Sequence, residues 1–89
     1  MYIKLKVGGI FMLYEGLKLK VIEDGIAFAR ITITKVINDT NFIAVDDSNP
    51  ENINELKFLE KTNAWHVVYK GLADEKCFKE EIPYTLCPV

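Results

Sequence analysis

Apolar and polar residues alternate with a period of two on both sides of the dipeptide Asp24-Gly25. The apolar positions of this alternation are Leu17, Leu19, Val21, Ala29, Ile31 and Ile33. Successive side chains of a strand point to opposite faces of a sheet, so the pattern predicts two half-buried strands over residues 17–24 and 26–37. Turn residues at 38–41 and a third apolar segment at 42–46 extend the prediction to a three-stranded antiparallel meander.

The dipeptide Asp24-Gly25 decides how the first two of these strands pair. A two-residue turn would place Leu19 opposite Arg30 and mix the two faces of the hairpin. A three-residue loop over Asp24–Ile26, with Gly25 in the left-handed conformation, places Leu19 opposite Ile31 instead. We therefore predict the three-residue loop. The exposed face of the hairpin is then expected to carry Lys18, Lys20, Arg30, Thr32 and Thr34.

Residues 48–63 have the features of a helix and its two ends. Asn49 can cap the first turn, and Pro50 suits the first helical position. The apolar residues Ile53, Leu56 and Leu59 have helical spacing, and acidic residues occur early, where they favour the helix dipole. We therefore predict a helix over residues 50–62.

The last part of the chain predicts two further strands. Trp65, Val67 and Tyr69 alternate with His66 and Val68, which predicts a strand over residues 64–70. Residues 72–81 fit either a short helix or an irregular charged loop, and Pro83 would end either one. A terminal strand is expected over residues 84–87.

Two interpretations of the first 14 residues remain open. Residues 2–7 alternate like a half-buried strand, and Gly8-Gly9 suits a hairpin turn that would place Leu5 opposite Met12 and Ile3 opposite Tyr14. Alternatively, the codons of Gly8-Gly9 are a translated ribosome-binding site ahead of a start codon at Met12, and residues 1–11 are an upstream extension. Under both interpretations we expect one domain over residues 1–89 with its core in residues 17–86.

Together these elements predict an α+β fold that is mostly antiparallel β. We expect a small bent sheet of five or six strands, or an open barrel of SH3-like or OB-like character, with one main helix. A chain of 89 residues buries only roughly 60% of its extended surface, so most large apolar residues are needed for the core. A deep active-site cleft is therefore not expected.

The composition predicts an ordinary globular domain, with 49% hydrophobic and 27% charged residues and a formal net charge of −2. No catalytic motif is present, His66 is the single histidine, and Cys77 and Cys87 lack the short spacing of a zinc site. We therefore expect no enzyme, no cofactor and no metal. No segment approaches the ~20 apolar residues of a membrane span, and two cysteines without a signal peptide favour the cytoplasm.

The candidate binding residues lie on the hairpin around Asp24-Gly25. They are Lys18, Lys20, Phe28, Arg30 and Thr32. Cations beside an aromatic ring can bind single-stranded nucleic acid, but an exposed strand face carries the same residue types without any ligand.

We therefore expect a small non-enzymatic protein-binding, adaptor or inhibitor module, which acts on an unidentified protein partner through an exposed face or an unpaired edge strand. The alternative is a small β-barrel that binds single-stranded nucleic acid through Lys18, Lys20 and Arg30. A homodimer that pairs through an edge strand is a further expectation.

Overall fold

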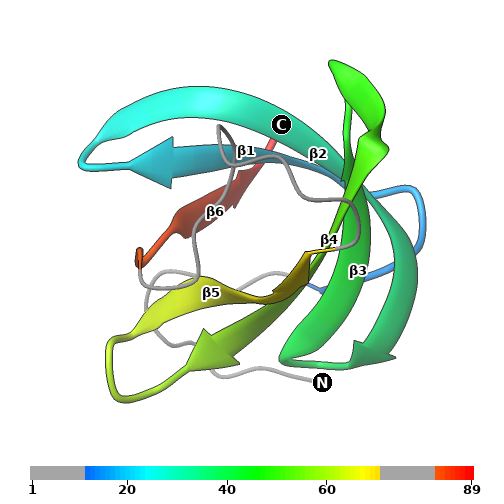
Figure 1. Ribbon diagram of the computed structural model, residues 1–89. Coiled ribbons are helices and arrows are strands. Elements are labelled where there is room, and N and C mark those ends of the chain that lie inside the picture. Colours follow the sequence, from blue (N-terminus) through cyan, green and yellow to red (C-terminus); the bar gives the residue numbers. More distant parts are fainter. Residues whose placement is uncertain (1–11, 71–81) are drawn as a thin grey trace.

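The computed structural model describes residues 12–70 and 82–89, which form one curled antiparallel sheet of six strands. The strands are β1 (Lys18–Glu23), β2 (Ile26–Asn38), β3 (Asn41–Asp46), β4 (Asn49–Leu59), β5 (Ala64–Lys70) and β6 (Thr85–Pro88). Their order across the sheet is β5-β4-β3-β2-β1-β6, so β1 to β5 pair as successive hairpins and β6 returns to pair with β1. The sheet bends into a half-barrel (Figure 1).

The inner face of the half-barrel forms the hydrophobic core. The buried core residues are Leu17, Leu19, Val21, Ile31, Ile33, Phe42, Ala44, Leu56, Trp65, Val67, Tyr84 and Leu86. The alternation predicted around Asp24-Gly25 is confirmed, because its apolar residues point inward and its charged residues point outward. The predicted three-stranded meander is confirmed as β1, β2 and β3.

The turn between β1 and β2 is shorter than the sequence predicted. Glu23 pairs with Ile26, so only Asp24 and Gly25 lie in the turn. Their φ angles are 54° and 80°, which is the geometry of a two-residue hairpin turn of type I′. The predicted three-residue loop is therefore wrong, although the left-handed conformation predicted for Gly25 is present.

A β-bulge in β2 reconciles this short turn with the predicted register. Ile22 pairs with Ala27 and Val21 pairs with Ala29, so Phe28 is the extra residue of the bulge. One inserted residue moves every following side chain to the opposite face. The pairing predicted beyond the bulge is confirmed.

Residues predicted as the main helix form β4 instead. Asp46 pairs with Asn49 across a two-residue turn, and β4 then runs antiparallel to β3. Pro50 lies near the start of β4, before the pairing with β5 begins at Asn54, so the missing N–H is tolerated there.

Within residues 12–70 and 82–89, no helix has the length and apolar character to cross a bilayer.

The helix prediction failed because the inward face of β4 is partly polar. Asn52, Asn54 and Leu56 are buried at alternate positions, whereas Ile53 is exposed. Two buried asparagines conceal the apolar alternation of a strand, and the spacing of the remaining apolar residues resembles that of a helix.

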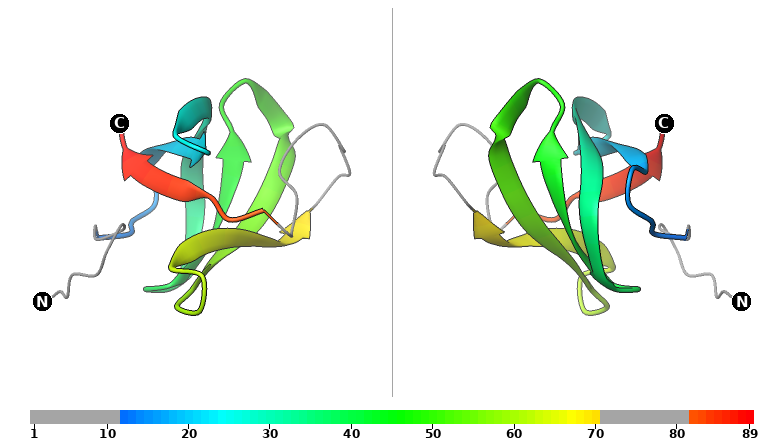
Figure 2. Two further views of the ribbon diagram at one scale, coloured as in Figure 1. Left: turned by 90° about the vertical axis from the view of Figure 1, so that its left-hand side faces the viewer. Right: turned by 90° about the vertical axis from the view of Figure 1, so that its right-hand side faces the viewer.

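β5 and β6 confirm the two predicted strands of the last part of the chain. β5 covers residues 64–70 as predicted, and β6 is displaced by one residue from the predicted 84–87. The N–H of Trp65 donates to the carbonyl of Tyr84 at 2.9 Å, and the N–H of Tyr84 donates to the carbonyl of Trp65 at 2.8 Å. These two bonds connect β5 to Tyr84, the residue directly before β6, and β5 and β6 lie across from each other in the side views (Figure 2).

The N-terminal hairpin prediction lies mostly outside the described residues, as does the prediction for residues 72–81. Met12 and Tyr14 belong to no strand, so the part of the hairpin prediction that falls on them is wrong. The chain turns there instead, because the N–H of Leu17 donates to the carbonyl of Tyr14 at 3.1 Å. Gly16 has a φ of 94°, and its N–H donates to the carbonyl of Ile33 at 2.8 Å, which leads the chain into β1.

Candidate binding site

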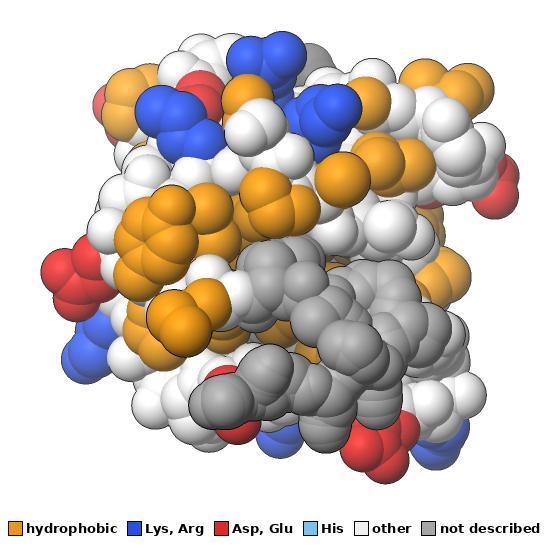
Figure 3. Space-filling model, turned by 180° about the vertical axis from the view of Figure 1, so that it is seen from behind, with side chains coloured by type: hydrophobic (Ala, Val, Ile, Leu, Met, Phe, Trp, Pro, Cys, Tyr) orange, Lys and Arg blue, Asp and Glu red, His pale blue; other side chains and the backbone are white. Residues whose placement is uncertain are grey.

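An open hollow of about 510 Å³ lies between the β1–β2 hairpin and the β3–β4 turn. The hollow is lined by Lys20, Ala27, Phe28, Ala29, Arg30, Asp47 and Ser48. Three of the five predicted binding residues, Lys20, Phe28 and Arg30, therefore lie together. Seen from behind, Lys and Arg side chains gather at the top of the molecule, where β1 and β2 lie, with hydrophobic side chains among and below them (Figure 3).

β2 extends past the end of β3 at this hollow. The first β2–β3 pair is Ile31 with Asp46, and the N–H of Asp47 donates to the carbonyl of Arg30 at 2.9 Å. In the part of the chain that the structure describes, no strand pairs with residues 26–29 on that side. The hollow thus lies beside a free sheet edge of the described chain, which includes Ala27 and Ala29.

Phe28 reaches the hollow because it is the extra residue of the bulge. Bulges re-aim the side chains next to them, and Phe28 is 45% exposed. Its ring centroid lies 5.7 Å from that of Tyr84, at an interplanar angle of 46°. One side of the Phe28 ring is therefore supported by a core residue, and another part remains accessible to a ligand.

Lys20 and Arg30 are directly opposite each other on β1 and β2. Like charges at directly opposed positions of a sheet repel each other and destabilise the pair. Among the described residues, no carboxylate forms an ion pair with either side chain. The hollow therefore has two neighbouring positive charges without a counter-ion from the described chain.

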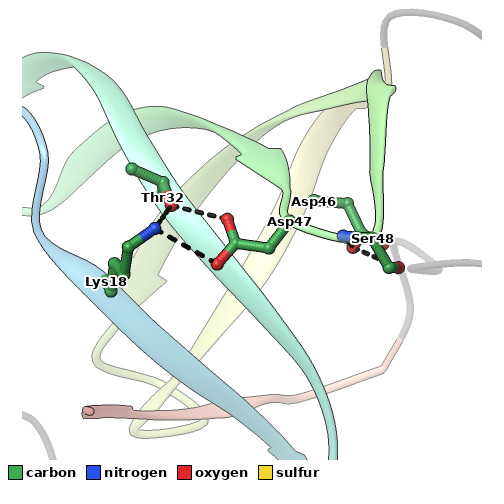
Figure 4. Close-up of polar contacts among 5 residues, drawn as sticks. All are labelled: Lys18, Thr32, Asp46, Asp47 and Ser48. Carbon is green, nitrogen blue, oxygen red and sulfur yellow. Dashed lines mark hydrogen bonds and ion pairs between the residues drawn. The ribbon is translucent and has the colours of Figure 1, made fainter.

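Lys18 and Thr32, the other two predicted binding residues, lie beside the hollow but do not line it. The Lys18 ammonium donates to Thr32 Oγ1 at 2.9 Å and lies 3.4 Å from Asp47 Oδ2. The Thr32 hydroxyl donates to Asp47 Oδ1 (Figure 4). These three side chains form a polar bridge across β1, β2 and the β3–β4 turn, in which Lys18 compensates the charge of Asp47.

The turn that carries Asp47 and Ser48 is held by the buried carboxylate of Asp46. Asp46 Oδ1 accepts hydrogen bonds from the N–H and the hydroxyl of Ser48, both at 2.9 Å. Asp46 Oδ2 accepts a hydrogen bond from the Asn52 amide at 3.3 Å. Because the turn is fixed from inside, one wall of the hollow has a defined position.

Sequence reasoning missed the contribution of Asp47 and Ser48 to the site. The helix predicted after residue 49 removed the β3–β4 hairpin, and with it the turn that brings these residues to β2. The turn-forming residues Asp47-Ser48-Asn49-Pro50 were the available signal, because they separate two strands as readily as they begin a helix.

Other aromatic side chains and the histidine lie outside the lining of the hollow. Trp65, Tyr84 and Phe42 are buried in the core, and the Trp65 ring lies 5.2 Å from the Phe42 ring between centroids. His66 Nε2 and Thr62 Oγ1 are 2.7 Å apart within the β4–β5 hairpin. Within the described residues, no three His, Cys, Asp or Glu side chains are placed to hold a metal ion.

Comparison of the chain with protein-family models, with curated proteins and with solved structures finds no match. A function for the chain therefore has to follow from its own residues.

Proposed function

We propose that this protein is a small non-enzymatic binding module that takes up an extended segment of a partner protein along residues 26–30 of β2. The observation that carries this proposal is the free edge of β2 beside the hollow. An extended peptide can add a strand to such an edge, with main-chain hydrogen bonds for affinity and side-chain pockets for specificity. An adaptor or an inhibitor can both act in this way.

Two properties of the edge decide which strands it can accept. It is short and carries the exposed apolar side chains of Ile26 and Phe28, which a partner strand would cover. A bulge and a nearby cation often protect an edge from uncontrolled pairing, and both are present here in Phe28 and Arg30. We also propose that the fold is an open barrel of SH3-like or OB-like character and that the protein is cytoplasmic.

Capture with the tagged full chain from its native host, followed by mapping of the contact, tests this function. Amide NMR shifts caused by the captured partner are expected at residues 26–30. Phe28→Glu should abolish capture, whereas Val68→Glu should leave it intact, because Val68 is 42% exposed on β5 and does not line the hollow. Shifts confined to β4 and β5, or no partner under any buffer condition, would contradict the proposal.

A specific observation also favours the alternative function, binding of single-stranded nucleic acid. Lys20, Phe28 and Arg30 meet at one hollow and combine cations for phosphates with a ring for base stacking. The carboxylate of Asp47 lines the same hollow and Lys18 is engaged with it, which disfavours a phosphate backbone. Binding that weakens steeply with salt and is lost in Lys20→Glu with Arg30→Glu would support this alternative.

A second copy of the chain is another candidate strand for the free edge. Small sheets leave edges that are often paired in homodimers. Sedimentation of the full chain over a range of concentrations measures this directly, and Phe28→Glu should convert such a dimer to a monomer.

A further inference from the structure

We infer that the segment bound at the β2 edge carries an acidic side chain, which is held between Lys20 and Arg30. This inference rests on the proposed function and names the chemistry of the partner: an extended acidic peptide segment.

The charges at the hollow leave a local excess of two cations. The carboxylate of Asp47 is matched by Lys18 at 3.4 Å and accepts a hydrogen bond from Thr32, so it is already engaged. Lys20 and Arg30 have no such partner among the described residues. The net charge that the described residues present to an incoming segment is therefore positive, although the whole chain has a formal charge of −2.

The arrangement of Lys20 and Arg30 suits a single carboxylate. Side chains at directly opposed positions of an antiparallel pair start about 5 Å apart at Cβ, so both can reach one anion. Arginine binds a carboxylate through two parallel N–H donors, and lysine adds a point charge with rotatable donors. A bound carboxylate would also remove the repulsion between the two cations.

The position of Arg30 connects this anion site to the free edge. The carbonyl of Arg30 accepts the last backbone bond from the β3–β4 turn, and no strand of the described residues pairs with residues 26–29 on that side. A strand added along residues 26–29 would therefore end beside the Arg30 side chain. Phe28, two residues away, would contact an apolar side chain of the same segment, so the expected motif is an acidic residue close to an apolar one.

Selection from a display library of random eight-residue peptides tests the inference on the folded full chain. The wild type and the double variant Lys20→Glu with Arg30→Glu are used as baits in parallel, and Lys35→Glu with Lys57→Glu is the matched control for the change of net charge. We expect one peptide position enriched in Asp or Glu on the wild type and on the control, and the same position enriched in Lys or Arg on the double variant. A selected acidic peptide should lose at least about tenfold in affinity when its acidic residue is changed to the amide.

The outcomes separate this inference from the function on which it rests. Peptides that shift the amides of residues 26–30 without any acidic preference would overturn the inference and leave the binding function standing. Absence of selected peptides on every bait would overturn both. Binding of a labelled single-stranded oligonucleotide that the double variant abolishes, without peptide enrichment, would overturn both in favour of the nucleic-acid alternative.

Discussion

The buried asparagines of β4 give opposite predictions for the same chemical change made two residues apart. Asn54 is buried, and its amide donates to Asn52 Oδ1 at 3.2 Å, but its own Oδ1 has no hydrogen-bond partner among the described residues. Asn52 is also buried, and its amide donates to the carboxylate of Asp46 at 3.3 Å. We therefore expect Asn54→Leu to stabilise the protein and Asn52→Leu to destabilise it.

The magnitudes follow from the groups that each change leaves behind. An unsatisfied buried acceptor costs about 1–3 kcal/mol, and a neutral hydrogen bond contributes about 0.5–1.5 kcal/mol, so Asn54→Leu should gain about 1 kcal/mol in free energy of unfolding. Asn52→Leu removes a hydrogen bond to a carboxylate and leaves the Asn54 amide without its acceptor. Its expected loss is about 2–4 kcal/mol.

Urea unfolding of the two variants and the wild type measures both effects. With a slope of about 1 kcal/mol/M for a small domain, the midpoint should rise by about 1 M for Asn54→Leu and fall by about 2 M or more for Asn52→Leu. Leucine has nearly the shape of asparagine, so steric differences between the two sites are minimised. A midpoint that falls equally in both variants would refute the assignment of Asn54 as an unsatisfied group.

Three further predictions concern the β1–β2 hairpin. Gly25→Ala should destabilise the protein by about 1–2 kcal/mol in urea unfolding, because a φ of 80° disfavours a residue with a Cβ even though no atom obstructs it. An unchanged urea midpoint would contradict the type I′ turn. Deletion of Phe28 should preserve the β1–β2 pairing beyond the bulge, which is measured as cross-strand NMR contacts. The deletion should cost about 1 kcal/mol, because the ring contact with Tyr84 is lost. Loss of the cross-strand NMR contacts would show that the bulge is required for the register. Lys18→Ala should lower the free energy of unfolding by less than about 1 kcal/mol, and less again in high salt, because its ion pair is exposed; a loss above about 2 kcal/mol would contradict this.

The sequence predicted the parts of the fold in which an apolar face alternates with a polar one. β1, β2, β3 and β5 were correct in position to within one residue. β1 and β2 were also correct in face, because Leu19 and Ile31 belong to such an alternation. β4 was not predictable in this way, since its inward positions include Asn52, which donates to Asp46 of the neighbouring strand, and Asn54, which donates to Asn52. Tertiary context overrode the local pattern there.

The same alternation of apolar and polar residues predicted one part of the candidate site. Lys20 and Arg30 could be placed together from the register alone, and this register was correct despite the wrong turn. A two-residue turn with a bulge and a three-residue loop give the same pairing beyond the bulge, so the alternation cannot distinguish them. The position of Phe28 and the approach of Asp47 depend on this bulge and on the β3–β4 turn, neither of which leaves a periodic signal.

The pairing of β6 with β1 has a consequence for the order in which the chain folds. β1 to β5 pair with their neighbours in sequence, and the entropy lost on closing each short turn is small. β6 pairs with β1 from the opposite end of the described chain, which is the contact of highest sequence separation. We therefore expect the meander of β1 to β5 to form first and β6 to dock onto it last, so that closure of the half-barrel limits the folding rate.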